Sequence, residues 1–150
     1  MTNFFQFEDD FVTSLRCIPM IVRYKLDTCG VKLKLAHWNQ FPQSDRQVLV
    51  EHPTTTPEEI NRYRTLLQEL AEKYTDLPLK DLPVEENLAW LDGQTIPETV
   101  LQKAQETDVK ITLEQWQNIT PLQRFALIKL SRPSHENQNF LPAVQEFNLV

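Results

Sequence analysis

The stretch VKLKLAHWNQF, residues 31–41, returns with changes as VKITLEQWQNI, residues 109–119, 78 positions later in the chain. The two stretches match without a gap, and in each of them a tryptophan follows a leucine by three residues. When the comparison is widened to residues 18–50 and 96–128, ten of the 33 aligned positions are identical. Ordinary amino-acid usage would give roughly two identities by chance. The sequence therefore predicts two copies of one structural unit.

The identical positions indicate what the shared unit requires. They are Ile18/Ile96, Pro19/Pro97, Val22/Val100, Lys25/Lys103, Val31/Val109, Lys32/Lys110, Leu35/Leu113, Trp38/Trp116, Arg46/Arg124 and Leu49/Leu127. With a one-residue slip, FEDDF (7–11) also matches VEENL (84–88) in chemical type. We therefore expect the copies to span about 7–50 and about 84–128, with the two tryptophans as core anchors.

The segment TTTPEEINRYRTLLQELAEKYT, between the copies, carries the clearest helical pattern. Thr56 is a helix cap, and Glu59 three residues later completes a capping box around Pro57. One apolar stripe then follows at spacings of three and four, made of Ile60, Tyr63, Leu67, Leu70 and Tyr74. The pattern predicts a long central helix over about 57–74.

Helical spacing also dominates the rest of the chain. We expect helices over residues 4–15, 19–29, 35–41 and 84–91, and others that begin at Ser44, Thr95, Thr112, Thr120 and near Pro142. Gly30 is expected in the left-handed conformation that ends a helix. No stretch alternates with period two for long enough to demand a sheet. The predicted fold is all-α, a single domain over residues 1–150 in which the two units flank the central helix and share one core.

Composition and charge disfavour several classes of function. A net charge of −6 argues against general binding to nucleic acid and against adhesion to anionic membranes. No apolar run approaches the roughly 20 residues of a membrane span, and the first ten residues lack the features of a signal peptide. The chain has two glycines, too few for a phosphate-cradling loop. We therefore expect a cytoplasmic protein.

No catalytic or metal-binding pattern emerges from the reactive residues. Cys17 and Cys29 are separated by twelve residues of predicted helix, about 18 Å, so they cannot form a disulfide or share a metal ion. They are expected to be small buried hydrophobic residues, although Cys17, just before the helix, could also be a reactive thiol. The three histidines are scattered along the chain. The sequence predicts no enzyme activity and no cofactor.

Residues that differ between the copies are the candidates for function. Cys17, Met20, Ile21 and Tyr24 form an extra apolar face on the 19–29 helix, where the second copy has Thr95, Glu98, Thr99 and Gln102. Either the central helix or the phenylalanine-rich N-terminus covers this face, or another protein does. Both explanations stay open at this point.

The first copy is also more basic than the second. Residues 18–50 carry Arg23, Lys25, Lys32, Lys34 and Arg46 against Asp27 and Asp45, whereas residues 96–128 are net acidic. This basic patch is either ordinary solvated surface or a surface that steers an acidic partner. We predict that a partner contacts the copy-specific residues Arg16, Cys17, Met20, Arg23, Tyr24 and Asp27.

The segment RCIPMIVRYKLDTCGVKLKLAHW (16–38), preceded by FFQFEDDF, is similar to the nitrate reductase associated protein family of cyanobacteria. TPEEINRYRTLLQEL and the ending LPAVQEF (141–147) also resemble that family. The resemblance implies a small accessory or maturation factor whose partner is assimilatory nitrate reductase, an enzyme with a molybdenum pterin and an iron–sulfur cluster. It implies no catalytic residue and no bound cofactor.

Two other classes of function remain as alternatives. A small-molecule or molybdenum-pterin carrier would hold its cargo between the two copies, in a deep polar pocket lined by Arg23, Lys25 or Arg46. A nucleic-acid-binding regulator is disfavoured by the net charge.

Overall fold

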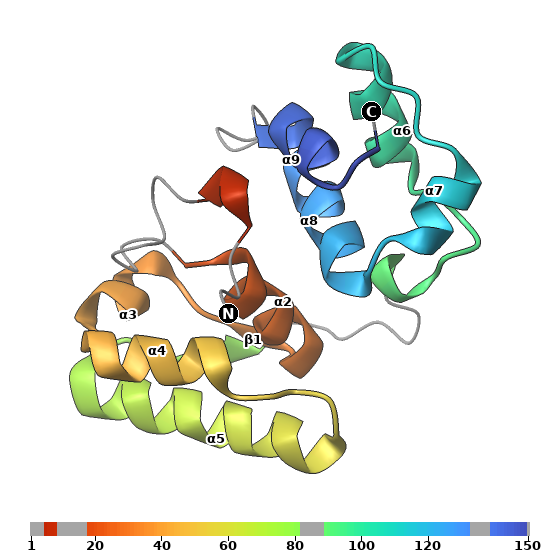
Figure 1. Cartoon of the computed structure of the whole chain (residues 1–150). Coiled ribbons are helices and arrows are strands. Elements are labelled where there is room, and N and C mark those ends of the chain that lie inside the picture. The colour runs from red at the N-terminus through yellow and green to blue at the C-terminus, as the bar shows by residue number, and fades with distance from the viewer. Residues whose placement is uncertain (1–4, 9–17, 82–88, 133–138, 150) are drawn as a thin grey trace. The chain divides into compact units, whose positions relative to one another are not determined.

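The computed structural model describes residues 5–8, 18–81, 89–132 and 139–149, and Figure 1 shows their helices in chain order. Contacts between residues divide the chain into two compact units. Unit 1 contains residues 1–4 and 8–84, and unit 2 contains residues 5–7 and 85–150. The predicted all-α class is confirmed. The prediction of one domain with one shared core stays a prediction.

The regular elements of the described residues are helices, 3₁₀ turns and one very small sheet. Unit 1 contains α2 (Met20–Cys29), β1 (Val31–Lys32), α3 (Leu35–Gln40), α4 (Gln43–Glu51), α5 (Pro57–Tyr74) and β2 (Lys80–Asp81). Unit 2 contains η2 (Ala89–Leu91), α6 (Glu98–Glu106), α7 (Leu113–Asn118), α8 (Pro121–Ser131) and α9 (Phe140–Glu146). A further 3₁₀ turn, η1 (Gln6–Glu8), lies near the N-terminus.

Helix α5 begins and ends where the sequence predicts. The Thr56 hydroxyl accepts a hydrogen bond from the Glu59 N–H at 3.2 Å, and the Glu59 carboxylate accepts one from the Thr56 N–H at 2.9 Å. This reciprocal pair satisfies two N–H groups that the first helical turn leaves without partners. The predicted stripe faces the core of unit 1, because Tyr63, Leu67 and Leu70 are buried.

Gly30 ends α2 in the left-handed conformation, with φ 74° and ψ 38°, and its N–H donates to the Leu26 carbonyl. The chain then turns into β1, which pairs antiparallel with β2 so that Val31 lies opposite Asp81 and Lys32 opposite Lys80. Two-residue strands are too short to leave a period-two pattern, so this sheet could not be predicted from the sequence.

The two units repeat the same order of helices at the spacing found in the sequence. Helices α2, α3 and α4 begin at residues 20, 35 and 43, and helices α6, α7 and α8 begin 78 positions later at residues 98, 113 and 121. Asp108, the counterpart of Gly30, also has a positive φ of 58°. The tryptophans Trp38 and Trp116 are both fully buried, as predicted.

Some predicted helix boundaries are wrong, and proline explains the clearest case. Thr95 was expected to cap a helix, but α6 begins at Glu98 and Pro97 stands at its cap position. A cap at Thr95 would force Ile96 into helical geometry, which the ring of the following proline disfavours. Similarly, α4 begins at Gln43 after Pro42 instead of at Ser44.

Two predicted helices fall largely on residues outside the described part of the chain. Within residues 4–15 only η1 is described, and within residues 84–91 only η2 is described, and both are 3₁₀ turns. In unit 2 the N-terminal phenylalanines pack against the end of α9. The rings of Phe5 and Phe7 stack at 5.2 Å, Phe5 lies 5.1 Å from Phe147, and the Phe7 N–H donates to the Glu146 carboxylate.

Candidate functional site

An arginine–tryptophan arrangement occurs once in each unit, with both tryptophans and Arg124 buried and Arg46 half-exposed. In unit 1, Arg46 Nε donates to the Trp38 carbonyl at 3.0 Å and its Nη2 donates to the Asn39 carbonyl at 3.1 Å. In unit 2, Arg124 makes the same two bonds, to Trp116 and Gln117, with the same lengths. These carbonyls belong to the last turns of α3 and α7, where the regular helical bonds run out, and the Trp38 carbonyl also accepts from the Phe41 N–H at 3.1 Å. Arg46 thus joins α3 to α4, although its side chain stays half-exposed.

Lys25 is a second residue of the expected patch that turns inward. Its Nζ donates to the carbonyls of Val50 and His52, both at 2.6 Å, at the end of α4. The side chain is buried, and burial lowers the pKa of the amino group, against smaller opposing effects of Cys29 and Glu51. Lys25 therefore joins α2 to α4.

The repeat counterpart of Lys25 has a different role. Lys103 forms an ion pair with Glu106 at 3.7 Å, one turn along the same helix. Sequence identity between the copies at this position therefore does not mean identical contacts. Nor does identity place a residue in the core, because Leu35 and Leu113 expose 49% and 43% of their surface.

The predicted partner-binding residues on α2 differ in accessibility. Met20 is only 3% exposed, and its N–H donates to the buried Glu8 carboxylate at 2.7 Å. Arg23, Tyr24 and Asp27 are partly exposed, and each also interacts with other residues of the chain. Burial raises the pKa of the Tyr24 hydroxyl. Arg16 and Cys17 lie outside the described residues.

The extra apolar face of α2 is therefore at least partly covered from within. Met20 is buried, and Ile21 packs against the core of unit 1. A partner could still contact Arg23, Tyr24 and Asp27, and for these residues the docking hypothesis stays a prediction.

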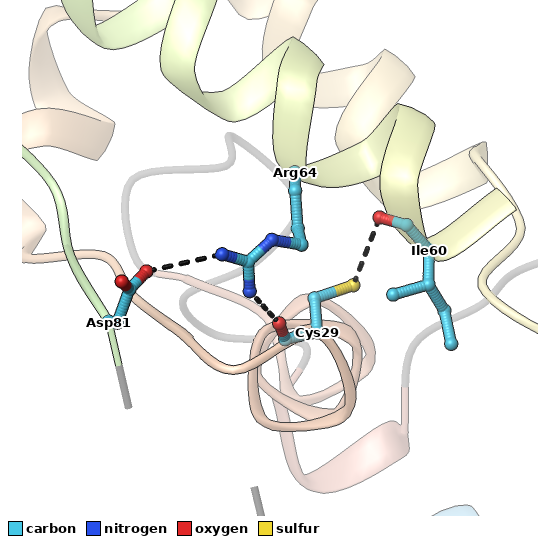
Figure 2. A network of polar contacts seen from close by, with 4 residues as sticks. All are labelled: Cys29, Ile60, Arg64 and Asp81. Carbon is cyan, nitrogen blue, oxygen red and sulfur yellow. Dashed lines mark hydrogen bonds and ion pairs between the residues drawn. The ribbon is translucent and has the colours of Figure 1, made fainter. Parts of the chain in front are cut away.

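Cys29, which ends α2, lies in a polar network that Figure 2 shows from close by. Arg64 of α5 donates from Nη1 to the Cys29 carbonyl and from Nη2 to the Asp81 carboxylate at 3.3 Å. The Cys29 thiol points to the Ile60 carbonyl at 3.8 Å. Burial raises the pKa of this thiol to about 11, so it stays protonated at neutral pH. Cys29 is thus a small buried core residue, as predicted, and the network fastens α2 and β2 to α5.

Two hollows of unit 1 lie on either side of the segment that follows α5. They have volumes of about 590 and 470 Å³ and share Glu72, Thr75, Asp76 and Leu77 in their linings. Neither is lined by Arg23, Lys25 or Arg46, the residues expected around a carrier's cargo. Moreover, Lys25 and Arg46 direct their donors at backbone carbonyls.

Three exposed lysines of unit 1 lie at or next to the small sheet, whereas Arg62 and Lys73, which are also exposed, lie on α5. Lys32 and Lys34 are exposed, and Lys80 of β2 lies directly opposite Lys32. Sequence analysis missed Lys80, because nothing in the local pattern links two residues 48 positions apart. These three exposed lysines form a basic region in the unit where the charge count predicted a basic patch.

A comparison with known protein families shows the family to which the chain belongs. A family model described as conserved nitrate reductase-associated protein matches residues 4–147. The chain belongs to this family. The match to the nitrate reductase-associated family extends over both units, and it confirms the resemblance carried by residues 16–38. No curated protein and no solved structure matches the chain.

Two further features, metal-binding groups of side chains and membrane-spanning helices, do not occur among the described residues. Within the described residues, no group of three or more histidine, cysteine, aspartate or glutamate side chains could hold a metal ion. None of the helices in that part of the chain combines the length and the apolar character that a membrane span requires.

Proposed function

We propose that this protein is an accessory or maturation factor of assimilatory nitrate reductase that acts by binding the enzyme. The observation that carries the proposal is the family match, which covers residues 4–147. In this proposal the protein is cytoplasmic and performs no catalysis of its own. Its two helical units are a duplicated scaffold, and the residues that distinguish unit 1 serve recognition.

The contacts of the polar residues support a role in binding over a role in chemistry. Lys25, Arg46 and Arg64 are cationic side chains that could bind an anionic substrate, but each of them donates to backbone carbonyls of unit 1. The Cys29 thiol is held protonated by burial. These side chains are used for rigidity, and a rigid surface loses little conformational entropy when it binds a partner.

The surface of unit 1 carries residue types that are common in protein interfaces. Partly exposed Arg23 and Tyr24 lie one after the other on α2, and arginine and tyrosine are enriched at the centres of interfaces. We therefore place part of the interface with nitrate reductase on α2, around these two residues and Asp27.

Affinity capture from nitrate-grown cells tests this function. A tagged copy of the chain, expressed in a strain that lacks the untagged protein, is expected to retain nitrate reductase in amounts well above a tag-only control. Loss of the protein is expected to lower nitrate reductase activity per molecule of enzyme.

Two results would count against the proposal. One is capture no greater than the control together with unchanged specific activity of the enzyme. The other is a purified chain that carries a pterin chromophore in stoichiometric amount, which would favour the carrier alternative instead.

A further inference from the structure

Three exposed lysines lie on or directly after the small sheet in unit 1: Lys32 in β1, Lys80 in β2, and Lys34 at the cap position of α3. Residues 31–34 alternate between buried and exposed, so Val31 and Leu33 point into the core while Lys32 and Lys34 point to solvent. Lys80 is the partner of Lys32 across the sheet and is also exposed. Residues directly opposite in an antiparallel pair project from the same face. We call Lys32, Lys34 and Lys80 the lysine strip.

The strip costs the fold stability. Like charges directly opposite in an antiparallel pair repel each other, and the buried side chains of Val31 and Leu33 already hold β1 in place. Within the described residues, the three amino groups make no ion pair, and the nearby carboxylate of Asp81 pairs with Arg64. The fold therefore does not require these charges.

The strip belongs to unit 1 and not to the repeated scaffold. Lys110 of unit 2 is the exposed counterpart of Lys32. In place of Lys34, however, unit 2 has Thr112, whose hydroxyl accepts a hydrogen bond from the Gln115 N–H as the cap of α7. In the described part of unit 2, no strand supplies a counterpart of Lys80.

Exposed leucines stand beside the lysine strip. Leu35 follows Lys34 directly, and Leu77 is 44% exposed. The buried ring of His37 connects the backbone at Lys34 with the backbone at Leu77. Its Nδ1 accepts from the Lys34 N–H and its Nε2 bonds the Leu77 carbonyl, both at 3.1 Å. The surface thus combines three cations with apolar side chains.

We propose that the lysine strip is a docking surface for an acidic protein segment that also carries an apolar residue. The inference rests on the proposed function, in which that segment belongs to nitrate reductase. Charge complementarity favours this occupant, because the strip is a local basic region on a chain of net charge −6. Nucleic acid fits less well, since three lysines neutralise only about three phosphates while the remaining charge repels the polyanion.

A matched pair of charge reversals tests the docking surface. Lys32→Glu and Lys110→Glu change the same residue at equivalent exposed positions of the two units. Binding of each variant to purified nitrate reductase is measured at low and high salt. Lys32→Glu is expected to weaken binding about tenfold at low salt and less at high salt, whereas Lys110→Glu is expected to change it less than about twofold.

Stability provides an independent check on the same surface. Lys80→Glu converts a repulsive cross-strand pair into an attractive one, so its melting temperature is expected to rise by about 1–3 °C while binding weakens. A variant that binds less well and melts lower would instead be explained by loss of the fold. That result would overturn the argument from the repulsive pair.

A third experiment uses a peptide and a DNA duplex as ligands in place of nitrate reductase. A hexapeptide of glutamate and leucine is titrated into the ¹⁵N-labelled chain, with a short DNA duplex in a parallel titration. The peptide is expected to shift amide signals at residues 31–35 and 77–81 more than those at residues 109–113. If the peptide binds the chain but nitrate reductase does not, nitrate reductase is the wrong partner, and the lysine strip is still a docking surface for an acidic segment. Equal effects of Lys32→Glu and Lys110→Glu on reductase binding, or tighter binding of DNA than of peptide, would overturn the docking surface.

Discussion

His37 of unit 1 and Gln115 of unit 2 occupy equivalent positions and make the same pair of hydrogen bonds with different chemistry. His37 accepts at Nδ1 from the Lys34 N–H and bonds the Leu77 carbonyl through Nε2. Gln115 accepts at Oε1 from the Thr112 N–H and donates from Nε2 to the Leu149 carbonyl. In both units the side chain therefore closes the first turn of a helix and ties a distant loop to it.

This equivalence predicts how His37 responds to substitution. His37→Gln is expected to keep both hydrogen bonds and to change the free energy of unfolding by less than about 1 kcal/mol. His37→Leu leaves the Lys34 N–H without its partner and removes one of the two bonds of the Leu77 carbonyl, which also accepts from the Thr75 hydroxyl, and it is expected to cost about 1–3 kcal/mol. Urea unfolding followed by circular dichroism measures both. If the glutamine variant is as unstable as the leucine variant, the two positions are not equivalent.

The arginines of the two units offer a second comparison. Arg46→Met and Arg124→Met each remove charged hydrogen bonds to two carbonyls at the end of the preceding helix, so both are expected to lower the free energy of unfolding by about 2–4 kcal/mol. Arg124→Met is expected to cost more than Arg46→Met, because Arg124 is buried and its Nη1 also donates to the Trp90 carbonyl at 3.1 Å, whereas Arg46 is half-exposed. Arg46→Glu with little effect on stability would show that Arg46 belongs to a surface patch after all.

Cys29 predicts a pH dependence with a definite sign. Because burial raises the pKa of its thiol to about 11 from 9.0, the folded chain keeps a proton between those values that the unfolded chain loses. Stability is therefore fully present below pH 9 and falls as the pH rises towards 11, by about 1 kcal/mol once screening by solvent is allowed for.

Two variants isolate this contribution. Cys17→Ser leaves Cys29 as the only thiol, and Cys17→Ser/Cys29→Thr replaces it by the residue that the second copy has at that position. Between pH 9 and 11 the first variant is expected to lose more stability than the second. Identical slopes would mean that the Cys29 thiol does not titrate differently in the folded state.

The docking role of α2 is separable from its structural role. Arg23→Glu and Tyr24→Ala are expected to weaken association with nitrate reductase while the fold survives, because both side chains are partly exposed. Trp116→Ala is expected to leave a cavity costing about 3–5 kcal/mol, because that ring is fully buried. Circular dichroism and pull-down on the same samples distinguish the two effects. Melting of Tyr24→Ala like Trp116→Ala would show that the face is covered internally.

The sequence predicts those parts of the fold whose causes are local. Thr56, Thr112 and Thr120 all cap helices as expected, because each is followed three residues later by the glutamate or glutamine that completes a capping box. The bounds of α5 follow from its cap and its apolar stripe. The offset of 78 residues predicts the matching helix starts without any knowledge of the contacts.

The contacts that define the candidate site are not local, and the sequence did not reveal them. Lys25 and Arg46 contribute positive charge to any count along the chain, but their carbonyl partners become visible only when the helices are packed. The pairing of Lys32 with Lys80 likewise depends on how the chain returns after α5. Of the residues that the charge count placed in a basic patch, Lys25 is buried and Arg46 half-exposed, whereas Lys32 and Lys34 are exposed.

The most direct test of the account is titration calorimetry of the purified chain against purified assimilatory nitrate reductase at low salt. The account predicts saturable binding with a dissociation constant of about 1 μM or tighter, weakened by salt and by Lys32→Glu but not by Lys110→Glu. Absence of heat and of co-elution at protein concentrations of about 100 μM would contradict a direct interaction with the enzyme.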